Sequence, residues 1–158
     1  MKITFVRPNI GRLEHSLYVD EGRMEPVGLG VLAGLTPRGV DCALCDDRIE
    51  AVPFDEPTDL AAITVETYTA RRAYEIAAEY RRRDVPVVMG GFHATLCPEE
   101  VRRYAESVVV GEAEELFPLL LDDYRHGRPG QADRSVVVGS PAPGTCGPPS
   151  KATLTRRE

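Results

Sequence analysis

Residues 60–91 read LAAITVETYTARRAYEIAAEYRRRDVPVVMGG and contain one complete strand–helix–strand unit. The apolar run at 60–65 predicts a strand that is covered on both faces. Apolar residues then recur at helical spacing through 70–83, and a second short apolar run follows at 85–89. Two strands that are joined by a helix in this way pair in parallel, with a right-handed crossover. The stretch therefore predicts an α/β fold built on a parallel sheet.

The same alternation of strands and helices extends to both sides of this unit. We expect further strands at 2–6, 40–45 and 108–110, and further helices at 27–36, 98–104 and 113–124. This order predicts a flavodoxin-like (Rossmann-like), doubly wound parallel sheet of five strands in the order 2-1-3-4-5, with helices on both faces.

The end of the chain differs in composition from the rest. Residues 129–158 are rich in proline, glycine and serine, with one short apolar patch at 136–138. Such a composition predicts a disordered tail. We therefore expect a single folded domain at 1–128.

Composition argues against several classes of function. The 158 residues include 25 acidic and 19 basic side chains, and the net charge of −6 disfavours binding to nucleic acid. The arginines at 71–72 and 81–83 fall on the polar side of the predicted helix, where charge normally serves solvation. No apolar run approaches the roughly 20 residues of a membrane span, and no signal peptide is recognisable. The four cysteines show no disulfide framework, so we expect a cytoplasmic protein with free thiols and no membrane partner.

The loops after the third, fourth and fifth predicted strands hold the candidate binding residues. In open parallel sheets, ligands bind beyond the carboxyl ends of the strands, where the strand order reverses. The candidates are Thr67 and Tyr68 after the third strand, Gly90, Gly91, His93 and Thr95 after the fourth, and Gly111 and Glu112 after the fifth. The glycines lack the Cβ atoms that would keep a bulky planar ligand away from the backbone. Thr69 is explained equally well as the N-cap of the following helix and as a ligand contact. Glu114 is better explained by its favourable interaction with the dipole of a helix N-terminus.

Three motifs lie in order along the chain, at 25–35, 87–100 and 109–114. They read EPVGLGVLAGL, VVMGGFHATLCPEE and VVGEAE. Together they resemble the cobalamin-binding domain that precedes the catalytic barrel in class B radical SAM enzymes of the methyltransferase and cyclase types. The resemblance covers residues 1 to about 128 and departs from the family pattern at Ala113, where the family usually has glycine.

The resemblance implies a module that binds cobalamin base-off, with the dimethylbenzimidazole tail drawn away from cobalt and no histidine ligand from the protein. It gives His93 a role in the binding loop without cobalt ligation, and a hydrogen bond that stabilises the loop is the alternative. The catalytic module of the family carries a CxxxCxxC triad that holds an iron–sulfur cluster and works with S-adenosyl-L-methionine. That spacing does not occur among Cys42, Cys45, Cys97 and Cys146. We therefore expect cobalamin as cofactor, no iron–sulfur cluster in this chain and no catalysis by this chain alone. The chain is then expected either to be a part or truncation of a radical SAM enzyme or to have a radical SAM module on another chain as a partner.

A second class of ligand must be weighed, because 28–33 reads GLGVLA and fits a G-x-G-x-x-A dinucleotide fingerprint. The fingerprint needs its first glycine in the turn directly after the first strand, whereas Gly28 lies about twenty residues beyond that strand. We interpret these glycines as positions of helix–sheet packing. A dinucleotide-binding oxidoreductase domain stays as the alternative function.

Three other interpretations are weaker. Cobalamin-binding domains of the methionine synthase and mutase type ligate cobalt through a D-x-H-x-x-G loop, which 8–26 does not contain. The pair Cys42 and Cys45 lies within a predicted strand, which favours buried structural thiols over a redox site. A phosphoacceptor receiver domain needs an aspartate after the third strand, where this chain has Glu66.

Overall fold

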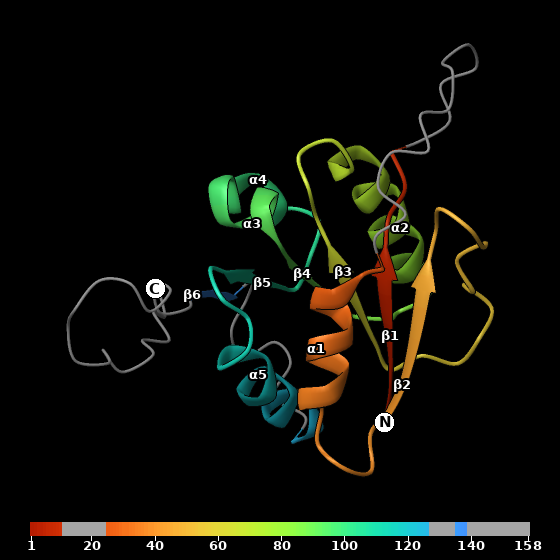
Figure 1. The fold of residues 1–158 in the computed structure, drawn as a ribbon, viewed down its shortest axis with the longest axis vertical. Helices are drawn as coiled ribbons and strands as arrows, with labels where there is room; N and C mark the ends of the chain where they lie inside the picture. The colour runs from red at the N-terminus through yellow and green to blue at the C-terminus, as the bar shows by residue number, and fades with distance from the viewer. Residues whose placement is uncertain (11–24, 127–134, 139–158) are drawn as a thin grey trace.

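The computed structural model describes residues 1–10, 25–126 and 135–138 and contains one six-stranded sheet (Figure 1). The strands are β1 (Lys2–Arg7), β2 (Asp41–Asp46), β3 (Leu60–Thr64), β4 (Val87–Gly90), β5 (Ser107–Val110) and β6 (Ser135–Val138). The helices are α1 (Val27–Leu35), α2 (Ala70–Arg82), α3 (Phe92–Leu96), α4 (Pro98–Val101) and α5 (Leu116–Arg125). All neighbouring strands pair in parallel, in the order β2-β1-β3-β4-β5-β6. The flavodoxin-like fold and the predicted order of the first five strands are therefore confirmed.

The sixth strand comes from the segment for which the sequence predicts a tail. Ser135–Val138 has the same four residues as β5 and pairs with it in register, Ser107 opposite Ser135. Valine favours strands, and the edge of β5 offers unpaired backbone groups to a neighbouring segment. The rest of the predicted tail, 129–134 and 139–158, lies outside the described residues.

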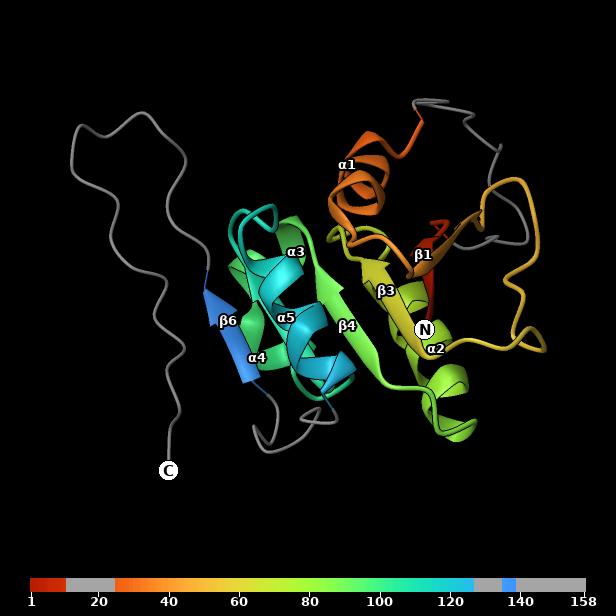
Figure 2. The ribbon, with the colours of Figure 1, turned by 90° about the horizontal axis from the view of Figure 1, so that it is seen from below.

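Two helical layers cover the sheet (Figures 1 and 2). Side chains alternate along β1, so that Ile3 and Phe5 face α1 and α5, whereas Val6 faces α2. Phe5 packs against Phe117 of α5 with ring centroids 5.6 Å apart. Five residues of α2 at helical spacing are buried: Ala70, Ala73, Ile76, Ala77 and Tyr80. Burying each large apolar side chain contributes about 1.5–3 kcal/mol, so the two faces of the sheet hold most of the stabilising contacts.

The glycines of α1 do not pack against the sheet. A Cβ added at Gly28, Gly30 or Gly34 would have no described atom within 4 Å. The helix instead contacts the sheet side through its buried Leu29 and through Leu32, which lie one turn apart on the same side of the helix. The interpretation of the glycines as packing positions is therefore wrong, because the helix is rotated so that they face outward.

The segment between β4 and β5 holds two short helices where the sequence predicts one. The first, α3, begins directly after Gly91, and the second begins at Pro98. Proline suits a first helical position and disfavours helical geometry in the residue before it, which separates α3 from α4 at Cys97. None of the described helices is long and apolar enough to cross a membrane.

Candidate functional site

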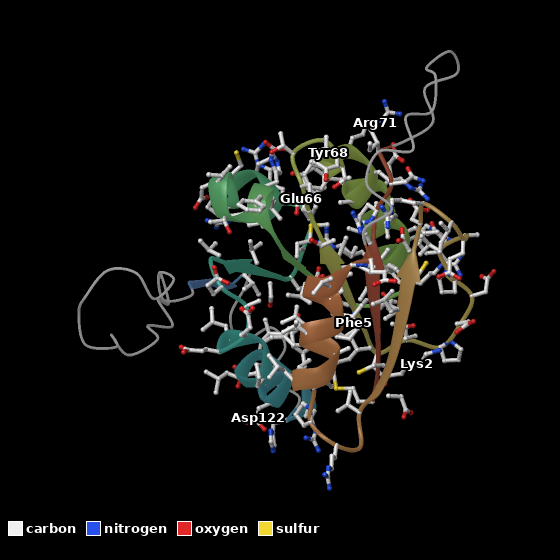
Figure 3. The ribbon with its side chains drawn as sticks, viewed as in Figure 1. Lys2, Phe5, Glu66, Tyr68, Arg71 and Asp122 are labelled. Carbon is white, nitrogen blue, oxygen red and sulfur yellow. The ribbon has the colours of Figure 1, made fainter. Side chains whose placement is uncertain are left out.

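The candidate loops meet at the carboxyl edge of the sheet. Figure 3 shows Glu66 and Tyr68 at this end of the molecule, above β3, and Lys2 at the opposite end, where β1 begins. Strand order reverses here, because β1 lies between β2 and β3. The structure thus brings the predicted residues to the edge where ligands of this fold class bind.

Gly91 lets the loop after β4 cross directly over the end of β3. Its φ is +109°, and an added Cβ would lie 2.9 Å from the carbonyl oxygen of Val65. The same carbonyl accepts a hydrogen bond of 3.0 Å from the backbone N–H of His93. Gly91 is therefore required by the packing of the protein itself. At Gly90 a Cβ would lie 3.6 Å from that of Val109, which is an ordinary contact.

Thr95 ties the loops after β4 and β5 together. Its hydroxyl donates to the carbonyl oxygen of Gly91 at 3.0 Å and accepts from the backbone N–H of Gly111 at 3.0 Å. Gly111 has a φ of +85°, a conformation that favours glycine. Three of the predicted residues thus form one hydrogen-bonded unit, the Thr95 clasp (Gly91, Thr95 and Gly111).

Three other candidates at this edge are exposed to solvent. Thr67, Tyr68 and Glu112 are exposed, and the exposed fraction of Tyr68 is 63%. Phe92, at the start of α3, is 73% exposed. Two exposed aromatic rings beside open backbone suit a large ligand with apolar faces.

Thr69 closes the loop after β3 and makes no side-chain cap bond to α2 among the described residues. Its hydroxyl accepts from the backbone N–H of Glu66 at 3.1 Å and lies 3.2 Å from the carbonyl oxygen of that residue. The sequence had left two explanations for Thr69, a cap of α2 and a contact with the ligand. The structure shows a third role, which is to hold the turn that presents Thr67 and Tyr68.

His93 points toward α4. The residue is buried, with an exposed fraction of 7%, and Nε2 lies 3.4 Å from Oε1 of Glu100. The Tyr74 hydroxyl donates to the same carboxylate oxygen at 2.9 Å. These two contacts, the tyrosine first, lower the pKa of Glu100. His93 thus contributes to the edge through its backbone, while its ring joins α3 to α4.

Glu66 is a site residue whose importance the sequence did not reveal. It follows β3 beside the point where the strand order reverses, and it is half-buried. Burial raises its pKa, and the charges of Arg7 and His93 act in the opposite direction. The signal in the sequence was an acidic residue placed directly after the mostly apolar run at 60–65.

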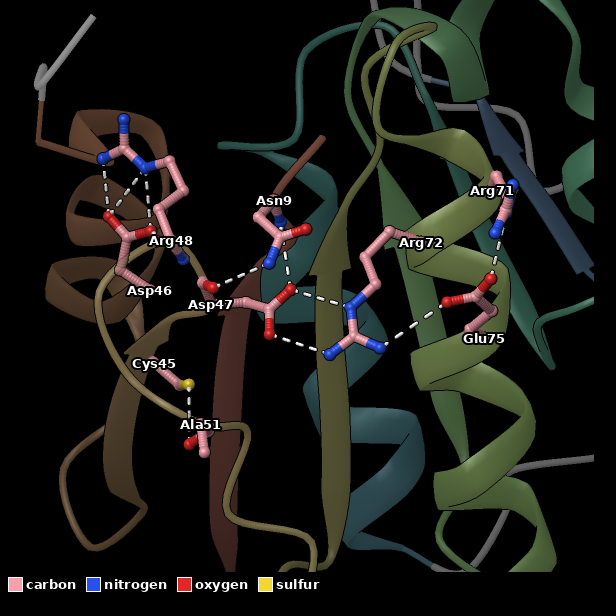
Figure 4. A network of polar contacts seen from close by, with 9 residues as sticks. All are labelled: Asn9, Cys45, Asp46, Asp47, Arg48, Ala51, Arg71, Arg72 and Glu75. Atoms are coloured by element: carbon pink, nitrogen blue, oxygen red, sulfur yellow. Dashed lines mark hydrogen bonds and ion pairs between the residues drawn. The ribbon is translucent and has the colours of Figure 1, made fainter. Parts of the chain in front are cut away.

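Asp47 organises the neighbouring loops at the same edge (Figure 4). Arg72 of α2 donates two hydrogen bonds of 2.8 Å to its carboxylate, which also accepts from the backbone N–H of Asn9 at 3.1 Å. The carboxylate is buried. The pair links α2 to the turn after β2, and the bond from Asn9 adds the loop after β1. The prediction that Arg72 serves only to solvate the polar side of α2 is therefore wrong, because its guanidinium binds the buried carboxylate of Asp47.

The two cysteines of β2 differ in exposure. Cys45 is buried, burial raises its pKa to about 12, and its thiol donates to the carbonyl oxygen of Ala51 at 3.8 Å. Cys42 is exposed. The prediction of buried thiols is confirmed for Cys45 and wrong for Cys42, because β2 is an edge strand with one open side. A thiol that stays protonated is a poor nucleophile, which argues against a redox pair here.

Comparison with known proteins identifies the ligand class. The family model of the B12 binding domain matches residues 18–121. The chain is 41% identical over 113 residues to bacteriochlorophyllide d C-8(2)-methyltransferase of Chlorobaculum tepidum, a match that covers 69% of this chain and 25% of that protein. It is 31% identical over 116 residues to bacteriochlorophyllide d C-12(1)-methyltransferase of the same organism, covering 72% and 25%.

A third relative is an uncharacterized methyltransferase of Pyrococcus horikoshii, 33% identical over 116 residues, with 65% of this chain and 25% of that protein covered. The chain thus spans about a quarter of the length of these relatives. No solved structure matches it. The matches favour cobalamin over a dinucleotide and confirm the resemblance to cobalamin-binding domains.

Proposed function

This chain belongs to the B12 binding domain family, and we propose that it holds a cobalamin at the carboxyl edge of its sheet, as the cofactor-binding module of a cobalamin-dependent radical SAM system. The observation that carries the proposal is the Thr95 clasp, which joins the glycine-bearing loops after β4 and β5 beside the exposed Tyr68. A bound cobalamin supplies a cobalt that can carry a methyl group.

The eight candidate residues take different roles in this proposal. Gly90 and Gly111 offer backbone to the corrin, and the exposed Thr67, Tyr68 and Glu112 offer side chains. The other three, Gly91, His93 and Thr95, act by holding the loops, since their own contacts are to protein atoms.

We propose that the protein gives cobalt no imidazole, so that the cofactor is bound base-off. The support is the lack of a D-x-H-x-x-G motif in the sequence and the contact of the His93 ring with Glu100. Electron paramagnetic resonance of the bound cobalt(II) form tests this. We expect no nitrogen splitting from a protein histidine, and weaker binding but the same spectrum in His93→Ala. A nitrogen splitting that disappears in His93→Ala would assign His93 as an axial ligand.

We also propose that the chain works with a radical SAM module, which would hold the iron–sulfur cluster and S-adenosyl-L-methionine. The support is its match to a quarter of the length of two methyltransferases and the outer face of α1. That face carries Val27, Val31 and Leu35, all exposed, and no charged residue occurs in the helix. The free thiols of Cys42, Cys45 and Cys97 suit the reducing cytoplasm, where we place the protein.

Equilibrium dialysis of the full chain against hydroxocobalamin, methylcobalamin and NADH tests the main proposal. We expect retention of the two cobalamins and none of NADH. Tyr68→Ala should weaken cobalamin binding without loss of stability, because the ring is mostly exposed. The matched control is Leu119→Ala, an exposed apolar residue of α5, which should leave binding unchanged. Retention of NADH alone would reverse the assignment.

A further inference from the structure

Three side chains of metal-binding type converge between α3 and α4. They are His93, Cys97 and Glu100, and one ligand atom from each lies within 4.8 Å of the others. His93 lies in α3, Cys97 at the break between the two helices and Glu100 in α4, so the way the two short helices meet brings them together. The proposed cobalamin site uses the backbone of this segment and leaves this cluster unexplained.

The separation of the ligand atoms suits a metal better than a hydrogen bond. The 3.4 Å between Nε2 of His93 and Oε1 of Glu100 is long for a hydrogen bond, whose usual range is about 2.7–3.2 Å. In a tetrahedral zinc site, the bond lengths to nitrogen, oxygen and sulfur place neighbouring ligand atoms about 3.3–3.6 Å apart. The nitrogen and the oxygen already have this separation, and the thiol is within reach of a small side-chain movement.

The surroundings of the cluster also fit a metal site. The Tyr74 hydroxyl donates to the ligating oxygen of Glu100, and such outer hydrogen bonds orient metal ligands. The imidazole is buried, Cys97 is half-buried and Glu100 is exposed, so a cation can enter from solvent and keep a water molecule. A mixed nitrogen, sulfur and oxygen set favours zinc over magnesium or calcium, which prefer oxygen alone.

We propose that His93, Cys97 and Glu100 bind a zinc-type divalent cation, with water in the fourth position. The cation would hold α3 against α4. Because the backbone N–H of His93 bonds to the carbonyl of Val65, it would also steady the loop after β4. The proposal is independent of the corrin, since all three ligands come from this chain and none has been assigned to cobalt.

A titration of the corrin-free, full-length chain with a Co²⁺ salt tests the proposal, with zinc added afterwards as a competitor. Co²⁺ bound by a thiolate gives a charge-transfer band in the near ultraviolet. We expect this band in the unmodified protein and its loss when zinc is added. Cys97→Ser should abolish the band, whereas the control Cys42→Ser, at the exposed thiol of β2, should keep it.

Two further pairs of variants separate ligands from neighbours. Glu100→Gln should weaken zinc binding, whereas Glu99→Gln, an exposed residue paired with Arg102, should not. Tyr74→Phe should weaken zinc binding by about 10–100-fold, the usual effect of removing an outer hydrogen bond. Thermal unfolding of each variant without metal shows that it is folded. Absence of the band, or its survival in Cys97→Ser, would overturn the proposal and leave the cobalamin assignment untouched.

Discussion

At the level of single residues, Gly91 occupies a position at which any side chain would be strained. Its φ of +109° and the 2.9 Å approach of an added Cβ to the Val65 carbonyl oxygen predict that Gly91→Ala loses about 1–3 kcal/mol of stability. Urea unfolding measures this. The control is Gly90→Ala, where the added Cβ meets only an ordinary contact and stability should change by less than about 1 kcal/mol. Equal stability of the two variants would show that the loop relaxes freely.

Tyr80 is a second residue with a measurable effect. It is fully buried in the layer between α2 and the sheet, and its hydroxyl has no hydrogen-bond partner among the described residues. An unpaired buried hydroxyl costs about 1–3 kcal/mol, so Tyr80→Phe should leave the free energy of unfolding unchanged or raise it by up to about 1 kcal/mol. A clear loss of stability in thermal or urea unfolding would indicate that the hydroxyl has a partner.

At the level of elements, an ion pair at the end of β2 makes the free energy of unfolding depend on pH. Arg48 donates hydrogen bonds to the Asp46 carboxylate, the shortest at 2.6 Å, and these bonds lower the pKa of Asp46. A carboxyl whose pKa is lower in the folded than in the unfolded chain stabilises the fold above its unfolded pKa of about 3.9. This contribution is lost as the pH falls from about 4 through the folded pKa.

The measurement is the stability difference between the unmodified protein and Asp46→Asn as a function of pH. We expect a constant advantage of the unmodified protein above about pH 5 and a shrinking one below about pH 4. The control is Asp122→Asn, an exposed carboxyl of α5, which should show little change over the same range. An Asp46→Asn difference that stays constant down to about pH 2 would contradict the role of Arg48.

At the level of the whole molecule, the chain is expected to bind its cofactor without performing a reaction. The CxxxCxxC spacing that holds a 4Fe–4S cluster in radical SAM enzymes does not occur among its four cysteines. Incubation of the purified chain with S-adenosyl-L-methionine, cobalamin and a reductant should therefore release no 5′-deoxyadenosine and no S-adenosylhomocysteine above a protein-free control. Turnover of S-adenosyl-L-methionine in the absence of a second polypeptide would contradict this prediction.

The alternation of strands and helices, the order of the first five strands and the edge at which the candidate loops meet could all be predicted before the structure was known. These follow from local periodicity and from the handedness of parallel crossovers. The sequence also singled out Gly91, Thr95 and Gly111, which the structure joins by hydrogen bonds; their contact with a cofactor stays a prediction. The family resemblance could also be recognised at this stage, because it depends on motifs in linear order, and the match to the B12 binding domain model confirmed it.

The partner of each side chain could be found only from the three-dimensional structure. Three contacts join residues that are far from obvious partners in the sequence. They are the pairing of Ser135–Val138 with β5, the bond of Arg72 to the buried Asp47, and the contact of His93 with Glu100. The outward rotation of the α1 glycines likewise depends on how the helix lies on the sheet. Periodicity shows which side chains share a face, but the partner of a polar group depends on distances set when the elements pack together.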